Sequence, residues 1–243
     1  MKKLLARLAS ATVIAVPLAA QDTTAFVDVN VVPMNQARVL AHQTVLVANG
    51  SIVAMSARDS IRIPRNARRI EGQGRLHLIP GLIDSHVHLE IDERRWLPIF
   101  LASGVTTVIN LRGEPRHLVL RDDVAAGRVV GPAIFTSGRY ANLPAIATPE
   151  DAAAEVRAQK SAGYDVIKIH GNLTGETFAR LADESRRAHI PLVGHAPRNL
   201  AFDSVIVRPA FSKRRRMCSS DASSRTVRTP SAAATASVVR SSV

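Results

Sequence analysis

Two histidines in this sequence stand at a spacing that suits a shared metal ion. His86 and His88 end the segment PGLIDSHVH, residues 80–88. Side chains two apart in a β-strand point to the same face, so both imidazoles would project together. Imidazole is a common ligand of zinc and other divalent ions. A lone His-x-His pair is a weak signal, but this one follows a Pro-Gly turn at the end of a predicted strand. We therefore take the pair as candidate metal ligands.

A lysine further along the chain has the same kind of position. Lys168 lies in YDVIKIH, residues 164–170, where alternation places it on one face with Val166 and His170. A buried lysine must lose its charge or find a partner. Carboxylation by CO2 would make it an anionic bidentate ligand able to bridge two metals. Two other interpretations stay open, a cation that binds substrate and a strand-end lysine whose amine reaches water.

The fourth candidate ligand, His195, lies in the segment IPLVGHAP, residues 190–197, at the end of the fifth predicted strand. Alone it would be read as structural, but with the other three residues it favours a shared metal site. Asp84 has the parity of the two paired histidines and is a candidate to orient one of them. Further residues near strand ends are candidates for binding substrate, and these are Arg112, Tyr140 and His170.

These residues sit in a repeating strand–helix pattern. Apolar strand-like runs recur about every 22 to 32 residues, which is the length of a βα unit and predicts a parallel sheet with helices outside it. The five runs are Leu82–Val87, Val105–Ile109, Ala133–Thr136, Val166–Ile169 and Pro191–Val193. A closed (β/α)8 barrel takes ~250 residues. Residues 81–202 are therefore predicted to form a partial TIM-type barrel of five strands, in an α/β fold.

The helices between these strands have clear boundaries. Thr148 and Pro149 predict the start of one helix, and Gly163 predicts its end. Thr174 is a candidate cap of the next helix.

Residues 21–80 show short strands and turns instead. Asn49-Gly50 between two strand-like runs predicts a hairpin. This region is predicted to form a small β-sandwich domain.

The two ends of the chain differ from its body. Residues 1–20 combine a basic start with a short apolar run, which predicts a signal peptide and export to the periplasm or outside the cell. Residues 203–243 contain ten serines and the run KRRR without any period, which predicts a disordered tail. That tail has two interpretations, a nucleic-acid or anionic-surface binding segment, and out-of-frame translation.

Composition excludes several classes of protein. The chain has 243 residues, of which 46% are hydrophobic, so it is not a disordered chain. One cysteine excludes an internal disulfide framework, and 4% aromatic residues disfavour a stacking platform for nucleic acid. The net charge of +12 is concentrated at the two ends, which leaves only +3 on residues 21–202. Nucleic acid is therefore not an expected partner of the folded body, and no membrane span is expected after signal cleavage.

Four segments together resemble the amidohydrolase superfamily, and within it the imidazolonepropionase-like hydrolases that include prolidase-type dipeptidases. They are IPGLIDSHVHL, GVTTVINLRG, YDVIKIH and IPLVGHAP, and the similarity covers about residues 24–199. The resemblance implies a binuclear zinc centre with His86 and His88 on the buried ion. It implies that carboxylated Lys168 bridges the two ions and that His195 holds the second one. The implied reaction is hydrolysis of C–N bonds in amides or dipeptides by a metal-bridging hydroxide.

The sequence departs from that family after about residue 201. The sixth-strand histidine and the eighth-strand aspartate, which is the general acid/base, have no counterpart. The expectation is a chain truncated after barrel strand five and inactive as a hydrolase. The alternatives are a non-catalytic, frameshifted product and a protein that binds anionic surfaces through its basic tail. Unpaired barrel edges would also favour self-association.

Overall fold

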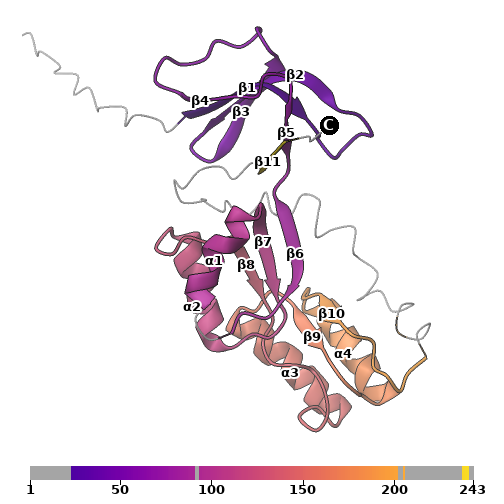
Figure 1. The fold of residues 1–243 in the computed structure, drawn as a ribbon. Coiled ribbons are helices and arrows are strands. Elements are labelled where there is room, and N and C mark those ends of the chain that lie inside the picture. Colours follow the sequence, from indigo (N-terminus) through magenta and orange to yellow (C-terminus); the bar gives the residue numbers. More distant parts are fainter. Residues whose placement is uncertain (1–22, 91–92, 202–204, 206–236, 241–243) are drawn as a thin grey trace, which may run out of the picture.

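The computed structural model describes residues 23–90, 93–201, 205 and 237–240 (Figure 1). The predicted signal peptide, residues 1–20, lies outside these ranges, as does most of the predicted tail, residues 203–243. Within the described ranges, no helix is both long enough and apolar enough to cross a membrane.

The first part of the chain forms a β-sheet. Its strands are β1 (Thr23–Val31), β2 (Leu40–Ala48), β3 (Ser51–Ala57), β4 (Arg68–Glu71) and β5 (Leu76–Ile79). The predicted hairpin is confirmed, because β2 and β3 pair antiparallel around Asn49 and Gly50, whose φ angles are 50° and 74°. Two positive φ angles in succession are what a tight hairpin turn needs.

The strands of this region belong to one hydrogen-bonded sheet, in the order β11-β5-β1-β2-β3 with β4 also on β1. The predicted β-sandwich would have two packed sheets, whereas the described strands of this region form one sheet. The reason is that β1 changes partner along its length, pairing with β4 at Thr24–Val27 and with β5 at Asn30–Val31. The change occurs at Asp28, whose φ is 55°. The buried Asp28 carboxylate accepts hydrogen bonds from His42 (2.7 Å) and Arg58 (3.3 Å).

One stretch of the predicted tail forms an element. Residues Ser237–Arg240 form β11, which pairs antiparallel with β5 from Ser237 opposite Ile79 to Arg240 opposite Leu76. The prediction that residues 203–243 carry no element was therefore wrong for these four residues. A sheet edge offers unpaired backbone groups to any extended segment that reaches it, and this pairing has no signal in the local sequence.

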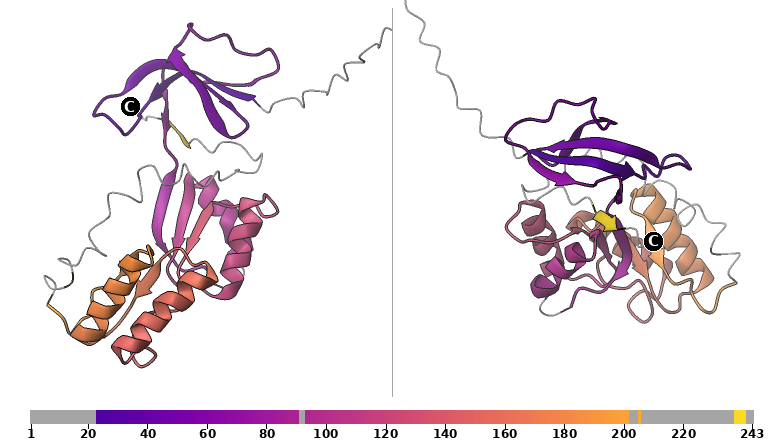
Figure 2. Two further views of the ribbon diagram at one scale, coloured as in Figure 1. Left: turned by 180° about the vertical axis from the view of Figure 1, so that it is seen from behind. Right: turned by 45° about the horizontal axis from the view of Figure 1, so that its top comes forward.

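The second part of the chain alternates strands and helices, as predicted (Figures 1 and 2). Its elements are β6 (Leu82–Val87), α1 (Glu93–Ala102), β7 (Val105–Asn110), α2 (Pro115–Ala125), β8 (Ala133–Thr136), α3 (Pro149–Ala162), β9 (Ile167–Ile169), α4 (Gly175–Arg187) and β10 (Leu192–Gly194). Strands β6, β7 and β8 pair in parallel, as do β9 and β10. Parallel bridges from Ser137 to Val166 and from Ala141 to Ile169 join the two groups. Within the described residues, five parallel strands thus alternate with helices.

The strand alternation predicted for YDVIKIH is confirmed by the two sides of β9. Ile167 and Ile169 are fully buried in a cluster with Phe178 of α4, on the helix side. Val166 instead packs with Ile109 and other residues in a separate cluster. Lys168, which shares the parity of Val166, is thereby directed to the inner side.

The predicted helix boundaries are also confirmed. The Thr148 hydroxyl accepts a hydrogen bond from the Asp151 amide (3.1 Å), while the Asp151 carboxylate accepts one from the Thr148 amide (3.0 Å). Helix α3 then ends at Gly163, which has a φ of 88°. Thr174 caps α4 in the same way, by accepting from the Thr177 amide (3.1 Å).

Candidate metal centre

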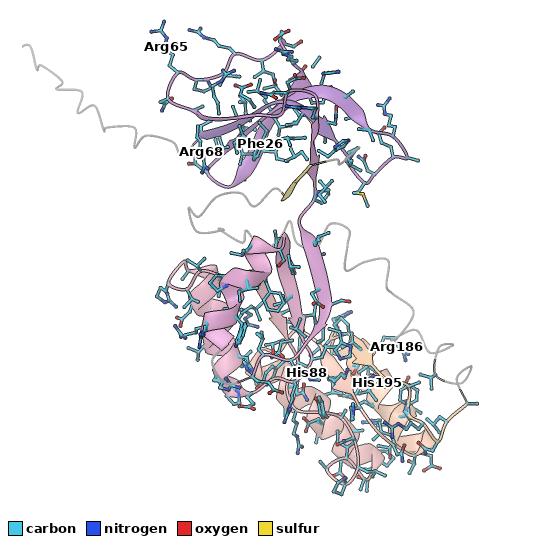
Figure 3. All side chains as sticks on the ribbon, viewed as in Figure 1. Phe26, Arg65, Arg68, His88, Arg186 and His195 are labelled. Atoms are coloured by element: carbon cyan, nitrogen blue, oxygen red, sulfur yellow. The ribbon has the colours of Figure 1, made fainter. Side chains whose placement is uncertain are left out.

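The carboxyl ends of β6, β9 and β10 bring the four predicted ligands together. His86 lies in β6 and His88 just after it, Lys168 is in β9, and His195 follows β10. The ring centroid of His86 lies 5.4 Å from that of His88 and 5.9 Å from that of His195. Figure 3 shows His88 and His195 on this end of the barrel strands. Residues separated by more than one hundred positions thus share one mouth, as the strand-end argument predicted.

Lys168 is buried beneath the three exposed histidines. Its side chain is only 1% exposed, and it is among the largest fully buried side chains of the described residues. Its Nζ lies within hydrogen-bond distance of Nε2 of His86, at 3.2 Å. Burial lowers the pKa of the Lys168 amine, because a low-dielectric surrounding disfavours the charged form. The structure therefore excludes the interpretation of Lys168 as a strand-end lysine whose amine reaches water.

The three histidines are held toward the neutral form. All three are exposed at the mouth, yet neighbouring protein atoms remove part of their water, and this lowers the pKa of His86, of His88 and of His195. The positive charge of Lys168 lowers each pKa further. Neutral imidazole is the form that binds metal ions.

Hydrogen bonds hold the backbone at two of these histidines. The carboxylate of Asp84 accepts a hydrogen bond from the His86 amide (3.1 Å), close to an irregularity in the β6–β7 register. This contact is to the backbone of His86 and not to its imidazole, so the orienting role of Asp84 toward a ring stays a prediction. The amide of His195 donates to the carbonyl of Ile169 (3.1 Å), which ties the segment after β10 to β9.

Two of the three predicted substrate-binding residues join the histidines. The rings of Tyr140 and His170 stack, with centroids 4.9 Å apart and planes 23° apart. His170 meets His195 edge-on at 5.3 Å, and Tyr140 lies 6.4 Å from His88. With His86 the five rings form a closed circuit around the mouth.

The third predicted substrate-binding residue, Arg112, lies beside the circuit. Its side chain is 57% exposed and forms an ion pair with Glu90 (3.2 Å). Its charge is also one of the causes that lower the pKa of His88.

The fold was compared with known proteins. No family model matches the sequence, and no curated protein does. Among solved structures, a protein from Bifidobacterium longum proposed to be a prolidase has a TM-score of 0.66 and 26% identity, over 72% of this chain and 49% of that one. Molinate hydrolase matches with a TM-score of 0.63 and 20% identity, over 72% and 54% of the two chains. A Xaa-Pro dipeptidase with bound methionine matches with a TM-score of 0.62 and 18% identity, over 72% and 57%.

This chain has the amidohydrolase superfamily fold. The resemblance deduced from the four sequence segments is thereby confirmed over 72% of the chain. The chain spans about half of the length of the solved structures that it matches.

The residues at the mouth of this amidohydrolase-type barrel fit a metal ion, with one condition. Two imidazoles on one zinc ion have ring centroids roughly 5 Å apart, given Zn–N distances of about 2.0 Å, which is near the 5.4 Å between His86 and His88. Among the described residues, however, no group of three or more His, Cys, Asp or Glu side chains is placed to hold a metal by itself. A metal site formed by these described residues would therefore have to include Lys168.

Sequence reasoning missed one residue that positions the site. Asn110, at the end of β7, is fully buried, and its side-chain oxygen accepts a hydrogen bond from the Leu89 amide (3.0 Å). Its side-chain nitrogen donates to the Thr136 hydroxyl (3.1 Å). Asn110 thus fixes the residue that directly follows His88. The available signal was the polar Asn110 directly after the apolar pair Val108 and Ile109 at the end of β7.

Proposed function

We propose that this chain carries the metal centre of a hydrolase that acts on C–N bonds of amides or dipeptides. The observation that carries the proposal is the position of Lys168. A buried amine lies 3.2 Å from one imidazole, and two further imidazoles surround that first one. Burying such an amine lowers the stability of the fold. A carboxylate formed on this amine, next to neutral histidines, would bind metal, and this function would explain why a destabilising residue lies here.

Each residue then has a definite role. His86 and His88 would hold one zinc ion, His195 a second one, and carboxylated Lys168 would lie between them. Bound zinc would supply an activated water and polarise the substrate carbonyl. Tyr140 and His170 form the stacked wall opposite His86 and are the proposed contacts of the substrate. Arg112, paired with Glu90 at the rim, is a proposed contact for a negatively charged part of the substrate.

The matched structures include a prolidase, a Xaa-Pro dipeptidase and phenylurea hydrolase B, whose names agree with hydrolysis of C–N bonds in dipeptides and ureas. Molinate hydrolase is also among them. These names are diverse, so the proposal extends to amide and dipeptide substrates in general. We also propose that the protein is exported, on the pattern of residues 1–20.

A second candidate is a metal-binding protein without hydrolase activity. Among the described residues, none takes the place of the barrel-strand-eight aspartate that the resemblance assigns as general acid/base. Proton transfer to the leaving nitrogen would then lack its usual group.

Hydrolysis by the full chain tests the two candidates together. The protein would be loaded with Zn2+ and bicarbonate and assayed against Xaa-Pro dipeptides and aryl amides. The first candidate predicts turnover that falls about 100-fold or more in His88→Ala. It also predicts turnover that is kept in His189→Asn, a control on an exposed histidine with a φ of 51° that asparagine tolerates. Zinc binding without turnover would support the second candidate, and absence of both would contradict both.

A further inference from the structure

Gly194, the last residue of β10, lies directly against the side chain of Lys168. Its φ of 119° is a conformation that residues with a side chain rarely adopt. A Cβ atom at this position would lie 2.8 Å from Cδ and 3.1 Å from Cε of Lys168. Both distances are shorter than a normal carbon–carbon contact. The stem of Lys168 therefore passes through the space that a side chain at position 194 would fill.

The absence of a Cβ atom at Gly194 also leaves room for the hydrogen bond between the His195 amide and the Ile169 carbonyl. A Cβ at position 194 would lie 2.3 Å from the carbonyl oxygen of Ile169. That oxygen accepts the hydrogen bond from the His195 amide (3.1 Å). Any displacement of this carbonyl would move His195 relative to β9. One position thus controls the approach of two candidate ligands that come from different strands.

We propose that Gly194 is a positioning residue for the metal centre. Its lack of a side chain lets the Lys168 stem reach His86 along the end of β10, and it keeps His195 tied to β9. This inference rests on the proposed function for its metal-binding consequence. Its packing consequence, the steric coupling between positions 194 and 168, rests only on the distances between these two residues.

A double-mutant cycle tests the packing consequence. Gly194→Ala would be made in three backgrounds, namely the natural chain, Lys168→Met and Lys168→Ala, and urea unfolding midpoints would be measured with EDTA present. Methionine keeps a stem of similar length, whereas alanine removes the atoms that a Cβ at 194 would meet. The expected drop in midpoint is large in the first two backgrounds and clearly smaller in the third.

The double-mutant cycle tests the steric coupling between positions 194 and 168 even when one of the variants does not fold. Folding of Gly194→Ala only in the Lys168→Ala background would support the proposal. An equal loss in all three backgrounds, including failure to fold in all three, would overturn it, because strain at φ 119° and the contact with Ile169 would then explain everything.

Zinc affinity tests the metal-binding consequence. Gly194→Ala is expected to weaken Zn2+ binding by about ten- to a hundredfold. The control is Gly163→Ala, at a position with a φ of 88° and no atom within 4 Å of the added Cβ, and it should bind zinc like the natural chain. Equal affinity of Gly194→Ala and the natural chain would overturn the positioning role. Lack of zinc binding by the natural chain would refute the proposed function, while the unfolding cycle would still decide on Gly194.

Discussion

At the scale of single residues, the buried amine of Lys168 is expected to lower the stability of the fold. Lys168 places an amine among buried atoms with one imidazole as its hydrogen-bond partner. Buried ionisable groups without a full set of partners destabilise a fold. Function can explain such a cost, because active sites commonly trade stability for reactivity.

We therefore expect Lys168→Met to stabilise the metal-free protein by about 1 to 2 kcal/mol. The methionine keeps most of the apolar stem and removes the amine that burial penalises. Urea unfolding in EDTA would measure the change, with Lys160→Met on the exposed surface of α3 as the control. A loss of stability in Lys168→Met would show that the amine contributes favourably without metal.

The residue types of the site were predictable, but their contacts were not. Alternation in YDVIKIH placed Lys168 inward, and the strand ends placed His86, His88 and His195 at one mouth. The stacking of Tyr140 on His170 and the buried bonds of Asn110 depend on side-chain directions after irregular strand ends. Local sequence does not encode these directions.

At the scale of elements, local signals predicted the barrel units well. Helix α3 begins and ends where Thr148, Pro149 and Gly163 indicate, because caps act within a few residues. The single sheet of β1 to β5 and the pairing of β11 on β5 were not predicted. Both depend on contacts between distant segments, which periodicity alone does not specify.

The cap of α3 gives a direct prediction. Thr148→Ala should lower the free energy of unfolding by about 1 kcal/mol, since the Asp151 amide loses its acceptor. Ser161→Ala, an exposed substitution near the other end of the same helix, should have little effect. Equal effects of the two substitutions in urea unfolding would contradict the cap assignment.

The Asp123 carboxylate of α2, which pairs with Arg94 of α1, makes stability depend on pH. Hydrogen bonds from Arg128 and then from Arg94 lower the pKa of Asp123. A lowered folded-state pKa stabilises the protein above the unfolded value of about 3.9, and that contribution is lost as the pH falls through the folded-state pKa.

Asp123→Asn should therefore lower the urea midpoint at pH 7, and its difference from the natural chain should shrink below about pH 4. Asp59→Asn, on a side chain that is 94% exposed, is the control and should change little at either pH. A difference between Asp123→Asn and the natural chain that persists unchanged at low pH would contradict this account.

At the scale of the whole molecule, the described residues have separate cores in the sheet and in the barrel. Leu46 packs with Ala25 and Val27 of the sheet, whereas Leu181 packs with Ile167 and Ile169 next to Lys168. The two regions are joined through Gly81, where a Cβ would lie 2.1 Å from the Thr106 hydroxyl of β7.

Because the two cores are separate, a Leu→Ala substitution should affect zinc binding differently in each of them. Leu46→Ala and Leu181→Ala should each cost about 2 to 5 kcal/mol of stability. Only Leu181→Ala should also weaken zinc binding, because it removes support from the strand that carries Lys168. Calorimetric zinc titration of both variants would measure this, and equal weakening by both would argue against separate cores.

The most direct test of the central claim is the amount of zinc that the full chain binds in the presence of bicarbonate. Equilibrium dialysis should give about two equivalents for the natural chain and for His189→Asn. Lys168→Met and His86→Ala should each bind less than about half of that amount. Binding that is equally strong in all four proteins, or below about half an equivalent in the natural chain, would contradict a metal centre built on Lys168 and its three histidines.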